Sequence, residues 1–333
     1  MAAARPSLSI VIPTYNGRCL LERCLLSVRA HAPAGTQVIV VDDASSDDTV
    51  PWLRANFPEV ELVRLEENEG FCGAVNASLP RARGDVVELL NNDTEVSANW
   101  ADACLDHFAD ASVGSVAPRV TRLGESNIVD SLGQEFHVCG WAYNRGYGRE
   151  LVPHDLLPSE VFGASGSCGF YRREALEQVG GLWPIYDFFL EDTDLAFRLR
   201  WAGYRCVYEP TAHVAHHGSA TTDAALSGTK VRMLSRNEEI VYWANMPAKE
   251  LVLGAIPHLG FLAVRLARKI WQGQWRAYLA GKVDALRAMP TIWRRRKETR
   301  ALARHSLPRV SSSLARNASI FFQGVRWLRK RAV

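Results

Sequence analysis

The sequence predicts an α/β fold in which a mostly parallel, Rossmann-like central sheet is flanked by helices and followed by a C-terminal helical extension. Two observations carry this prediction. Strand-like apolar runs and helix-like amphipathic segments alternate through the first 120 residues, and the residues beyond 229 are helical in composition and basic. Alternating strands and helices form βαβ units, so the strands are expected to lie parallel and to be covered on both faces.

The first predicted helix shows the pattern most clearly, because residues 18–31 place Leu21, Cys24, Leu25 and Val28 on one face. The remaining segments follow in chain order. Strands are predicted over residues 7–13, 37–42, 60–65 and 85–91, and the other helices over residues 50–56 and 71–81.

The segments after residue 120 are less regular. Residues 121–160 are rich in glycine, aromatic and polar residues, which predicts loops and short strands. A helix is then expected over residues 192–202, with Asp194 and Arg198 paired four positions apart. A strand over residues 204–208 leads to a group of histidines.

The formal net charge of +3 conceals a strong asymmetry. Residues 1–229 hold 17 Lys/Arg and 31 Asp/Glu, a balance of −14, whereas residues 230–333 hold 22 Lys/Arg and 5 Asp/Glu, a balance of +17. We therefore predict an acidic domain over residues 1–229, whose clustered carboxylates need cations. We predict a basic, amphipathic helical region over residues 230–333, which is attracted to an anionic surface.

Tryptophans interleave with Arg and Lys in the basic region, at Trp271, Trp275, Trp293 and Trp327. A basic helix of this kind can lie in the plane of a bilayer interface, so an anionic membrane surface is the expected partner. The apolar stretch over residues 251–264 is shorter than the ~20 residues that a membrane-spanning helix needs. The alternatives are a polyanion-binding arm or a soluble helical subdomain with a solvated basic face. The acidic first part argues against a nucleic-acid partner.

Seven cysteines, an odd number without any C-x-x-C spacing, favour a reducing compartment over a disulfide framework or a zinc site. The N-terminus runs directly into a strand pattern, so no signal peptide is expected. These features predict a cytoplasmic protein, peripheral at the inner face of the cell membrane.

Polar side chains cluster where the predicted strands end. Asp42 and Asp43 follow the second strand, and Asn91, Asn92 and Asp93 follow the fourth. Ligands of open α/β sheets bind beyond the carboxyl ends of the strands. Crowded oxygens there favour a divalent cation that bridges to a diphosphate, although the same residues could simply shape turns or cap helices. No Gly-x-Gly-x-x-Gly or Walker pattern follows the first strand, which disfavours dinucleotide and P-loop sites.

Two further clusters extend the pattern. Glu191 and Asp192 begin a predicted helix, where a carboxylate aimed into a cleft can take the proton from an attacking hydroxyl. Asp192 could instead serve only as a helix cap, and the residues alone leave open which of the two acts. His213, His216 and His217 come just after a predicted strand, and one of them could be a neutral ligand to the same metal.

Taken in order, these segments resemble a family 2 glycosyltransferase of the GT-A fold, close to the rhamnosyltransferase-like branch. The resemblance spans residues 7–220 and rests on IVIPTYNG, VVDDASSDDT, NEGFCGAVN, LLNNDT, FGASG, LEDTDLAFRLRWAGY and HHGSAT. It implies that residues 1–229 form a catalytic domain that inverts the configuration of the transferred sugar. In such an enzyme one base activates an acceptor hydroxyl, which attacks the anomeric carbon opposite the nucleotide diphosphate.

The resemblance implies roles for individual residues. Asp192 would be the catalytic base. Asp93 keeps the final carboxylate of the family's metal-binding D-x-D, while Asn91 replaces the first, so coordination of Mg²⁺ or Mn²⁺ is expected to be weaker or shared differently. His216 matches a histidine that completes the metal site in some members, with His217 as the alternative. The residues implied in nucleotide-sugar binding are Thr14, Asp42, Asp43, Asn76 and Asn92.

The resemblance also implies the substrates: a dTDP- or UDP-linked donor, with dTDP-L-rhamnose the leading candidate, and a glycan or polyprenyl-linked glycan acceptor in cell-envelope polysaccharide synthesis. Residues 133–150, with Trp141, Tyr143, Arg145 and Tyr147, could contact donor or acceptor, or could simply pack. A sugar nucleotidyltransferase is the alternative enzyme. It would usually carry a Gly-rich basic loop after the first strand, whereas PTYNGR has one Gly and one Arg.

Overall fold

A computed structural model describes residues 5–217, 227–303 and 307–316 of the chain. The strands are β1 (Leu8–Thr14), β2 (Gln37–Asp42), β3 (Glu61–Arg64), β4 (Val86–Leu90), β5 (Thr94–Val96), β6 (Val113–Arg122), β7 (Glu125–Ser131), β8 (Gln134–Phe136), β9 (Ala142–Asn144), β10 (Ser159–Val161), β11 (Cys168–Arg172) and β12 (Arg205–His216). The α-helices are α1 (Arg18–His31), α2 (Thr49–Asn56), α3 (Gly70–Ser78), α4 (Trp100–Asp106), α5 (Arg173–Val179), α6 (Glu191–Trp201), α7 (Gly228–Asn245), α8 (Ala248–Trp271), α9 (Trp275–Arg287), α10 (Met289–Ala301) and α11 (Leu307–Ser313).

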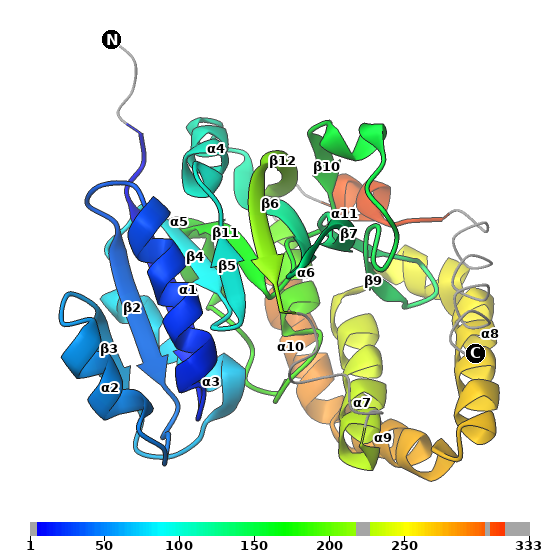
Figure 1. Cartoon of the computed structure of the whole chain (residues 1–333). Helices are drawn as coiled ribbons and strands as arrows, with labels where there is room; N and C mark the ends of the chain where they lie inside the picture. The colour runs from blue at the N-terminus through cyan, green and yellow to red at the C-terminus, as the bar shows by residue number, and fades with distance from the viewer. Residues whose placement is uncertain (1–4, 218–226, 304–306, 317–333) are drawn as a thin grey trace.

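The central sheet is mixed and has the strand order β10-β12-β6-β11-β4-β1-β2-β3, with β5 added to β12 and β7 to β6 (Figure 1). Its first half is the predicted parallel unit, because β1 pairs in parallel with both β2 and β4, and β2 with β3. β11 then runs antiparallel between β4 and β6, while β6 and β12 are parallel. The chain builds outward from β1 to β3 and returns to the other side of β1 with β4. This reversal opens a crevice at the carboxyl ends of β1 and β4.

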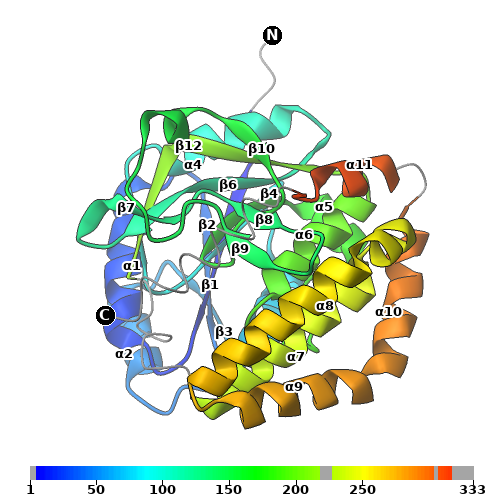
Figure 2. The same ribbon diagram turned by 90° about the vertical axis from the view of Figure 1, so that its right-hand side faces the viewer.

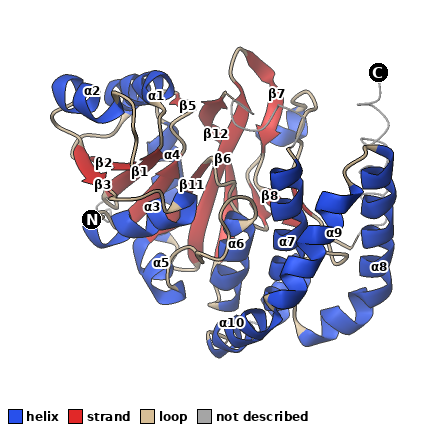
Figure 3. Cartoon of the chain, turned by 90° about the horizontal axis from the view of Figure 1, so that it is seen from below, coloured by secondary structure: helices blue, strands red, loops and turns tan. Residues whose placement is uncertain are grey.

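Two apolar cores fill the faces of the sheet. One lies under α1, α2 and α4 and contains Leu25 and Trp100. The other lies under α3, α5 and α6 and contains Val75. Figure 3 shows α1 and α2 on one side of the strands and α3 and α5 on the other. Successive residues of β1 serve opposite cores, Ile10 the first and Val11 the second, as the alternation of a strand requires.

Several predicted elements are confirmed. The predicted helix over residues 18–31 has the bounds of α1, and all four predicted core positions on it are buried. Arg198 Nε donates to Asp194 Oδ2 at 2.7 Å, with both side chains buried, so the expected pair within α6 exists. The segment over residues 121–160 contains β7, β9 and other short strands joined by loops.

The end predicted for the strand over residues 204–208 is wrong, because β12 extends to His216. β12 passes an irregularity between Glu209 and His213, and it continues to His216 because β5 and β6 keep pairing with it. His213 and His216 therefore lie within a strand. His217 is exposed, and its backbone N–H donates to the carbonyl oxygen of Asp93 at 2.9 Å.

The C-terminal helices join the sheet domain through α6. α7 packs against α6, and α9 and α10 pack against α7. α7 begins at Gly228, close to the boundary expected at residue 229, although the division into two domains stays a prediction. Figure 2 shows α8 lying across α7 as the outermost layer on this side.

α8 is longer than the apolar run indicated. It has 24 residues and continues past Arg265 and Lys269, so by length and composition it could cross a membrane; no other described helix meets that test. The stretch predicted over residues 251–264 was shorter because it ended before the first charged residue of the helix, Arg265. Its outward side leaves large apolar residues exposed, including Val252 at 77% and Ile256 at 83%.

The inward side of α8 rests on the turn between β8 and β9. The His258 ring stacks on Tyr242 with centroids 3.8 Å apart, and its Nδ1 donates to the carbonyl oxygen of Cys139 at 2.8 Å. Gly254 faces the carbonyl oxygen of Val138, and a Cβ at this position would lie 2.8 Å from that oxygen. Glycine is therefore required for α8 to approach this turn so closely.

Candidate active site

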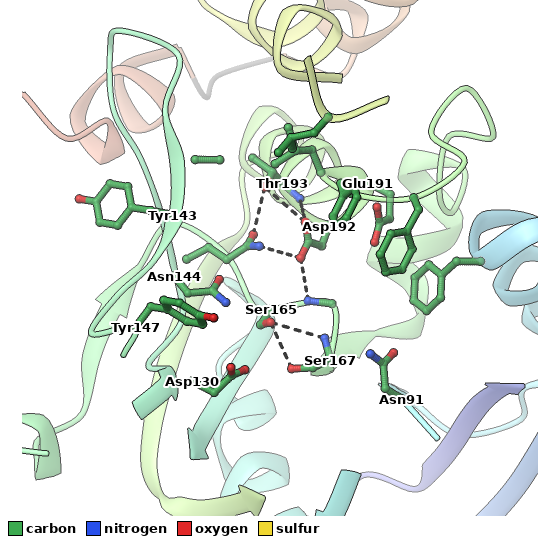
Figure 4. Close-up of a pocket in the computed structure, with 18 of the residues that line it drawn as sticks. Asn91, Asp130, Tyr143, Asn144, Tyr147, Ser165, Ser167, Glu191, Asp192 and Thr193 are labelled. Carbon is green, nitrogen blue, oxygen red and sulfur yellow. Dashed lines mark hydrogen bonds between the residues drawn. The ribbon is translucent and has the colours of Figure 1, made fainter. Parts of the chain in front are cut away.

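A cavity of about 440 Å³ is built from the end of β4, the β8–β9 hairpin, the loop after β10, the start of α6 and one residue of α7. Phe71 of α3, Asp130 of β7 and His216 of β12 also line it, so the cavity combines parts of the chain from Phe71 to Leu234. Figure 4 shows polar side chains from several of these segments turned toward one another. Its ionisable and amide residues include Asn91, Asp130, Gln134, Glu191, Asp192 and His216.

Thr14 and Asn92 tie the ends of β1 and β4 together. Asn92 Nδ2 donates to Thr14 Oγ1 at 2.9 Å. Gly17 lies against this pair, and a Cβ at that position would be 2.5 Å from Asn92 Nδ2, so a larger residue would displace the Asn92 amide. Both residues lie at the sheet crevice but outside the cavity lining.

Asp42 is fully buried at the end of β2. Its Oδ2 accepts from the Ser45 backbone N–H at 3.2 Å and lies 3.5 Å from Arg64 Nε. Oδ1 has no hydrogen-bond partner within the described part of the chain. A buried oxygen left in this way is costly, so Asp42 has an acceptor to offer to a ligand N–H or O–H.

Asp43 is explained by local structure. Its two carboxylate oxygens accept from the backbone N–H groups of Glu69 and Gly70, at 2.7 and 3.0 Å, where α3 begins. Burial raises the pKa of Asp43, and these two hydrogen bonds only partly oppose the rise. Asp43 therefore caps the start of α3, which is the structural alternative stated for it in the sequence. Its contact with a nucleoside stays a prediction.

Asn76 also has a structural explanation. Its Nδ2 donates to the carbonyl oxygen of Leu182 at 2.8 Å, and its Oδ1 accepts from the Leu182 backbone N–H at 2.9 Å. This paired contact ties α3 to the segment that precedes α6. Asn76 does not line the cavity, so its expected place near the phosphates gains no support from the geometry.

Asp93 and His216 meet beside the cavity, together with a third residue, Asp130 of β7. His216 Nε2 lies 3.3 Å from Asp93 Oδ1, and His216 Nδ1 lies 3.0 Å from Asp130 Oδ2. Burial lowers the pKa of His216, but the two carboxylates outweigh burial and raise it to about 10. The ring is therefore held between two negative charges.

This arrangement fits a divalent cation, which would take the place of the proton on His216 Nε2 between the ring and Asp93. Asp93 Oδ1 is buried and has no hydrogen-bond partner of good geometry among the described residues, while Asp130 fixes Nδ1 of the neighbouring imidazole. A carboxylate on the far ring nitrogen is the usual way in which proteins orient a metal-binding histidine. In the described ranges no three His, Cys, Asp or Glu side chains converge as an ion site. Two protein ligands are nevertheless typical of Mg²⁺ bound together with substrate phosphates.

Asp192 is held by several donors. Its Oδ2 accepts from Gln134 Nε2 at 2.6 Å and from the Gly166 backbone N–H at 2.7 Å, and its Oδ1 accepts from the Thr193 backbone N–H at 2.6 Å. Burial raises the pKa of Asp192 above its ordinary value, although these hydrogen bonds oppose the rise. The carboxylate is thus fixed in direction and is more basic than an exposed aspartate.

Glu191 differs from its neighbour. It is 6% exposed, and its Oε2 has no hydrogen-bond partner within the described residues. Burial and the charge of Asp192 raise the pKa of Glu191 to about 8. In Figure 4 several dashed lines meet at Asp192 and others join Ser165 to Ser167, but none reaches Glu191.

Aromatic residues form much of the remaining wall. Tyr143 and Tyr147 line the cavity from the hairpin side, whereas Trp141 packs on Tyr143 with ring centroids 4.8 Å apart. Arg145 turns away, because its Nη1 donates to Ser159 Oγ at 2.9 Å and its guanidinium lies over the Tyr208 ring. Of the aromatic segment singled out in the sequence, the two tyrosines therefore reach the site.

Sequence reasoning missed Asp130 and Gln134. Both lie in the segment over residues 121–160, whose weak periodicity hid that β7 and β8 bring them to the cavity. The only local signal for these two residues was that Asp130 and Gln134 lie on either side of a turn at Gly133. It could not indicate that they face His216 and Asp192.

Residues 9–180, more than half of the chain, match the family model described as "Glycosyl transferase family 2". The N-acetylglucosaminyl-diphospho-decaprenol L-rhamnosyltransferase of Mycobacterium tuberculosis is 33% identical over 239 residues, which cover 65% of this chain and 77% of the relative. The pre-mycofactocin glycosyltransferase of the same organism is 33% identical over 213 residues, covering 62% of this chain and 42% of the relative.

Among solved structures, a mannosyltransferase from Pyrobaculum calidifontis in complex with GDP-Man and Mn²⁺ is similar with a TM-score of 0.54 and 19% identity. The similarity covers 85% of this chain and 88% of that chain. At this identity the likeness shows the fold.

Proposed function

Because this chain belongs to glycosyl transferase family 2 and is rhamnosyltransferase-like, we propose that it is an inverting enzyme that transfers L-rhamnose from dTDP-L-rhamnose to a hydroxyl of a lipid-linked glycan. One observation carries the proposal: a single cavity presents the oriented Asp192 carboxylate and the His216 ring that Asp93 contacts. The Asp192 carboxylate suits a base, and the pair of His216 and Asp93 suits a site for a cation bound to a diphosphate. The family also favours this reaction over the sugar nucleotidyltransferase alternative.

Asp192 is the proposed base. It takes the proton of the acceptor hydroxyl while that oxygen bonds to the anomeric carbon, and the bond from this carbon to the diphosphate oxygen breaks. The bonding pair leaves with the nucleoside diphosphate. The hydrogen bonds from Gln134 and Gly166 aim the carboxylate, and its raised pKa makes it a stronger base. One carboxylate suffices, because no sugar–enzyme bond is formed.

Asp93 and His216 are the proposed ligands of Mg²⁺ or Mn²⁺, with Asp130 orienting the ring and His217 the less suitable alternative because it is exposed. A bound cation neutralises the charge that develops on the leaving diphosphate. Asn91 lines the cavity where the family's first carboxylate would be. An amide oxygen there would be the weaker ligand that the sequence suggested.

The nucleotide is proposed to lie over the ends of β1, β2 and β4. Asp42 offers its unpartnered Oδ1 there, and Thr14 and Asn92 close the base of the crevice. Asp43 and Asn76 would contribute indirectly, by fixing the first turn of α3 and its link to Leu182.

An anionic bilayer surface is the proposed location of the acceptor, and α8 and α9 are the proposed contact. The outward side of α8 exposes Val252, Leu253, Ile256 and Leu259 over two turns. On α9 the exposed apolar residues recur at helical spacing as Trp275, Leu279, Val283 and Leu286.

Charge supports this choice of partner, because residues 230–333 carry the balance of +17. A helix with exposed apolar side chains in a cationic region binds anionic lipid in the plane of the interface. This would hold the enzyme at the inner face of the membrane, where a polyprenyl-linked acceptor resides. Recovery of the full chain with phosphatidylglycerol vesicles, but not with phosphatidylcholine vesicles or duplex DNA at equal salt, is the expected result. Equal recovery with DNA would favour the polyanion-binding alternative.

The transfer itself is tested with the full chain, a panel of dTDP- and UDP-sugars, and a polyprenyl-diphosphate-linked N-acetylglucosamine acceptor, with Mg²⁺ or Mn²⁺. We expect release of the nucleoside diphosphate and a product of inverted anomeric configuration, with dTDP-L-rhamnose the best donor. Retention of configuration would refute the mechanism. Release of pyrophosphate from a nucleoside triphosphate would instead indicate the nucleotidyltransferase.

A further inference from the structure

We propose that Glu191 is held as a neutral carboxylic acid that donates a hydrogen bond to a hydroxyl oxygen of the bound sugar substrate, while Asp192 beside it stays ionised as the base. This rests on the proposed glycosyl transfer for the identity of the ligand. The protonation of Glu191 itself rests only on the surroundings of the two side chains.

The two carboxyl groups are adjacent in sequence and have opposite surroundings. Asp192 accepts hydrogen bonds from Gln134, Gly166 and Thr193, all of which stabilise its negative form. Glu191 lines the same cavity and is more than nine-tenths buried, yet its Oε2 has no hydrogen-bond partner in the described ranges. The negative charge therefore resides on Asp192, and the proton belongs on Glu191.

The charges around Glu191 act in the same direction. The ionised Asp192 opposes a second negative charge beside it, and Asp194 adds to this effect although Arg198 is paired with Asp194. The backbone N–H of Glu191 opposes the shift, but burial and Asp192 prevail and raise the pKa to about 8. From the elements packed on this side, the titratable groups that interact with it are Cys72 of α3 and Tyr171 of β11, both of which burial keeps neutral.

A neutral acid in this place has a use that a carboxylate lacks. It carries one O–H donor and one free acceptor oxygen, a combination that matches a sugar hydroxyl, which both accepts and donates. Phe71, Phe188 and Leu190 also line the cavity, so the bond would form in surroundings of low polarity where it is strongest. An oriented pair of carboxyl groups with separated pKa values is a recognised way to divide donor and base roles between two like side chains.

Substitution separates this role from the alternatives. Glu191→Gln keeps a donor and an acceptor and cannot ionise, so we expect its kcat/KM to stay within about threefold of the wild-type value, while Glu191→Ala loses about tenfold to a hundredfold. In Glu191→Ala, a raised KM for the nucleotide sugar would identify a donor hydroxyl, and a raised KM for the acceptor would identify an acceptor hydroxyl. Glu191→Gln as inactive as Asp192→Asn would overturn the proposal, because Glu191 would then be acting as a base.

The pH profile provides a second readout. Wild-type activity is expected to fall above about pH 8 as Glu191 loses its proton, and this alkaline limb should be absent from Glu191→Gln. The same alkaline limb in both proteins would contradict the assignment.

A direct readout needs no activity. The infrared difference between wild type and Glu191→Gln at pH 7 should contain the carbonyl band of a protonated carboxylic acid, which disappears at alkaline pH. Absence of that band at pH 7 would overturn the proposal even if transfer is confirmed. Conversely, a protein that transfers no sugar but shows the band would refute the proposed function and leave the protonation of Glu191 standing.

Discussion

Two buried glutamates of the sheet domain, Glu88 and Glu191, differ in their surroundings from the buried Glu239 of the C-terminal helices. Burial raises the pKa of Glu88 and of Glu191 to about 8, and neither has a basic partner within the described residues. In the helices burial also raises the pKa of Glu239, but hydrogen bonds and charge from His258 and Lys282 outweigh it and lower the pKa to about 2. Glu239 thus has its charge compensated by basic partners, whereas Glu88 and Glu191 do not, and of these two Glu191 lines the cavity.

This difference separates a supporting region from a reactive one. Carboxyl groups with perturbed pKa values in a cavity are typical of functional sites, whereas fully paired ones serve packing. Substitutions in the sheet domain should therefore affect catalysis or ligand binding, and those in the C-terminal helices should affect stability or attachment.

Asp192→Asn should remove the proposed base while preserving its shape. We expect kcat to fall by about 10²–10⁴-fold, because the acceptor hydroxyl then keeps its proton during attack. Steady-state kinetics with the donor and acceptor measure the loss, and thermal unfolding should remain close to that of the wild type. Near-normal turnover by a folded Asp192→Asn protein would exclude this residue as the base.

Glu239→Gln should damage the helical part without touching the chemistry. The change leaves His258 without its charged partner and leaves Lys282 with Glu238 alone, at a cost of about 3 kcal/mol in the free energy of unfolding. Because the pKa of Glu239 is lowered in the folded state, its contribution is present above about pH 4.5 and is lost as the pH falls toward about 2. Urea unfolding at pH 7 and pH 3 tests this sign, and an equal cost at both values would contradict it.

Asp130→Asn should weaken the proposed cation site rather than abolish it. The amide still reaches His216 Nδ1 but no longer supplies negative charge, so the affinity for Mn²⁺ should fall about 10–100-fold. Titration of activity against Mn²⁺ gives the shift, and saturating Mn²⁺ should restore most of kcat. Ser159→Ala is a matched control from the same side of the sheet, and no change in Mn²⁺ affinity is expected for it.

Ile256→Glu should separate attachment from catalysis. Ile256 is 83% exposed on α8, and a charge there opposes insertion into lipid, so the partition onto phosphatidylglycerol vesicles should fall about tenfold. Transfer to a short, soluble acceptor should be unchanged. Gln272→Glu, also exposed near the end of α8, is the control of equal charge. If both variants lose binding equally, charge alone and not the apolar side of α8 governs attachment.

Glu88→Gln should stabilise the sheet part at alkaline pH. The folded pKa of Glu88 lies above the ordinary value of 4.5, so the contribution of Glu88 to stability is greatest below about pH 4.5 and is lost as the pH rises to about 8. Glutamine does not titrate and can still accept from Trp100 Nε1. We expect the variant to gain about 3–4 kcal/mol relative to wild type between pH 5 and pH 8. A pH-independent difference would show that Glu88 is not protonated.

Local patterns predicted the first part of the fold well. The bounds of α1, the parallel strands around β1 and the Asp194–Arg198 pair all follow from periodicity or spacing within one element. Features that depend on pairing between distant strands were beyond this reasoning. β12 extends to His216 because β5 and β6 pair with it, and no local signal in residues 209–213 indicates this.

The site was predicted in the same uneven way. Asp192 and His216 share a cavity as expected, because both follow recognisable motifs. Asp43 and Asn76 proved to have hydrogen-bond partners within the protein, which a motif cannot distinguish from ligand contacts. Asp130 and Gln134 could not be predicted from the sequence, because their roles depend on their contacts with His216 and Asp192, which are distant in the chain.

The close approach of Gly254 to the turn between β8 and β9 has a mechanical consequence. That turn carries at one end the strand of Gln134, whose amide aims Asp192, and at the other the strand of Tyr143. The close contact at Gly254 and the hydrogen bond from His258 to Cys139 hold α8 directly against the turn, so we expect a displacement of α8 to move the turn as well. We therefore expect that a surface bound by the outward side of α8 also influences the orientation of Asp192, the proposed base.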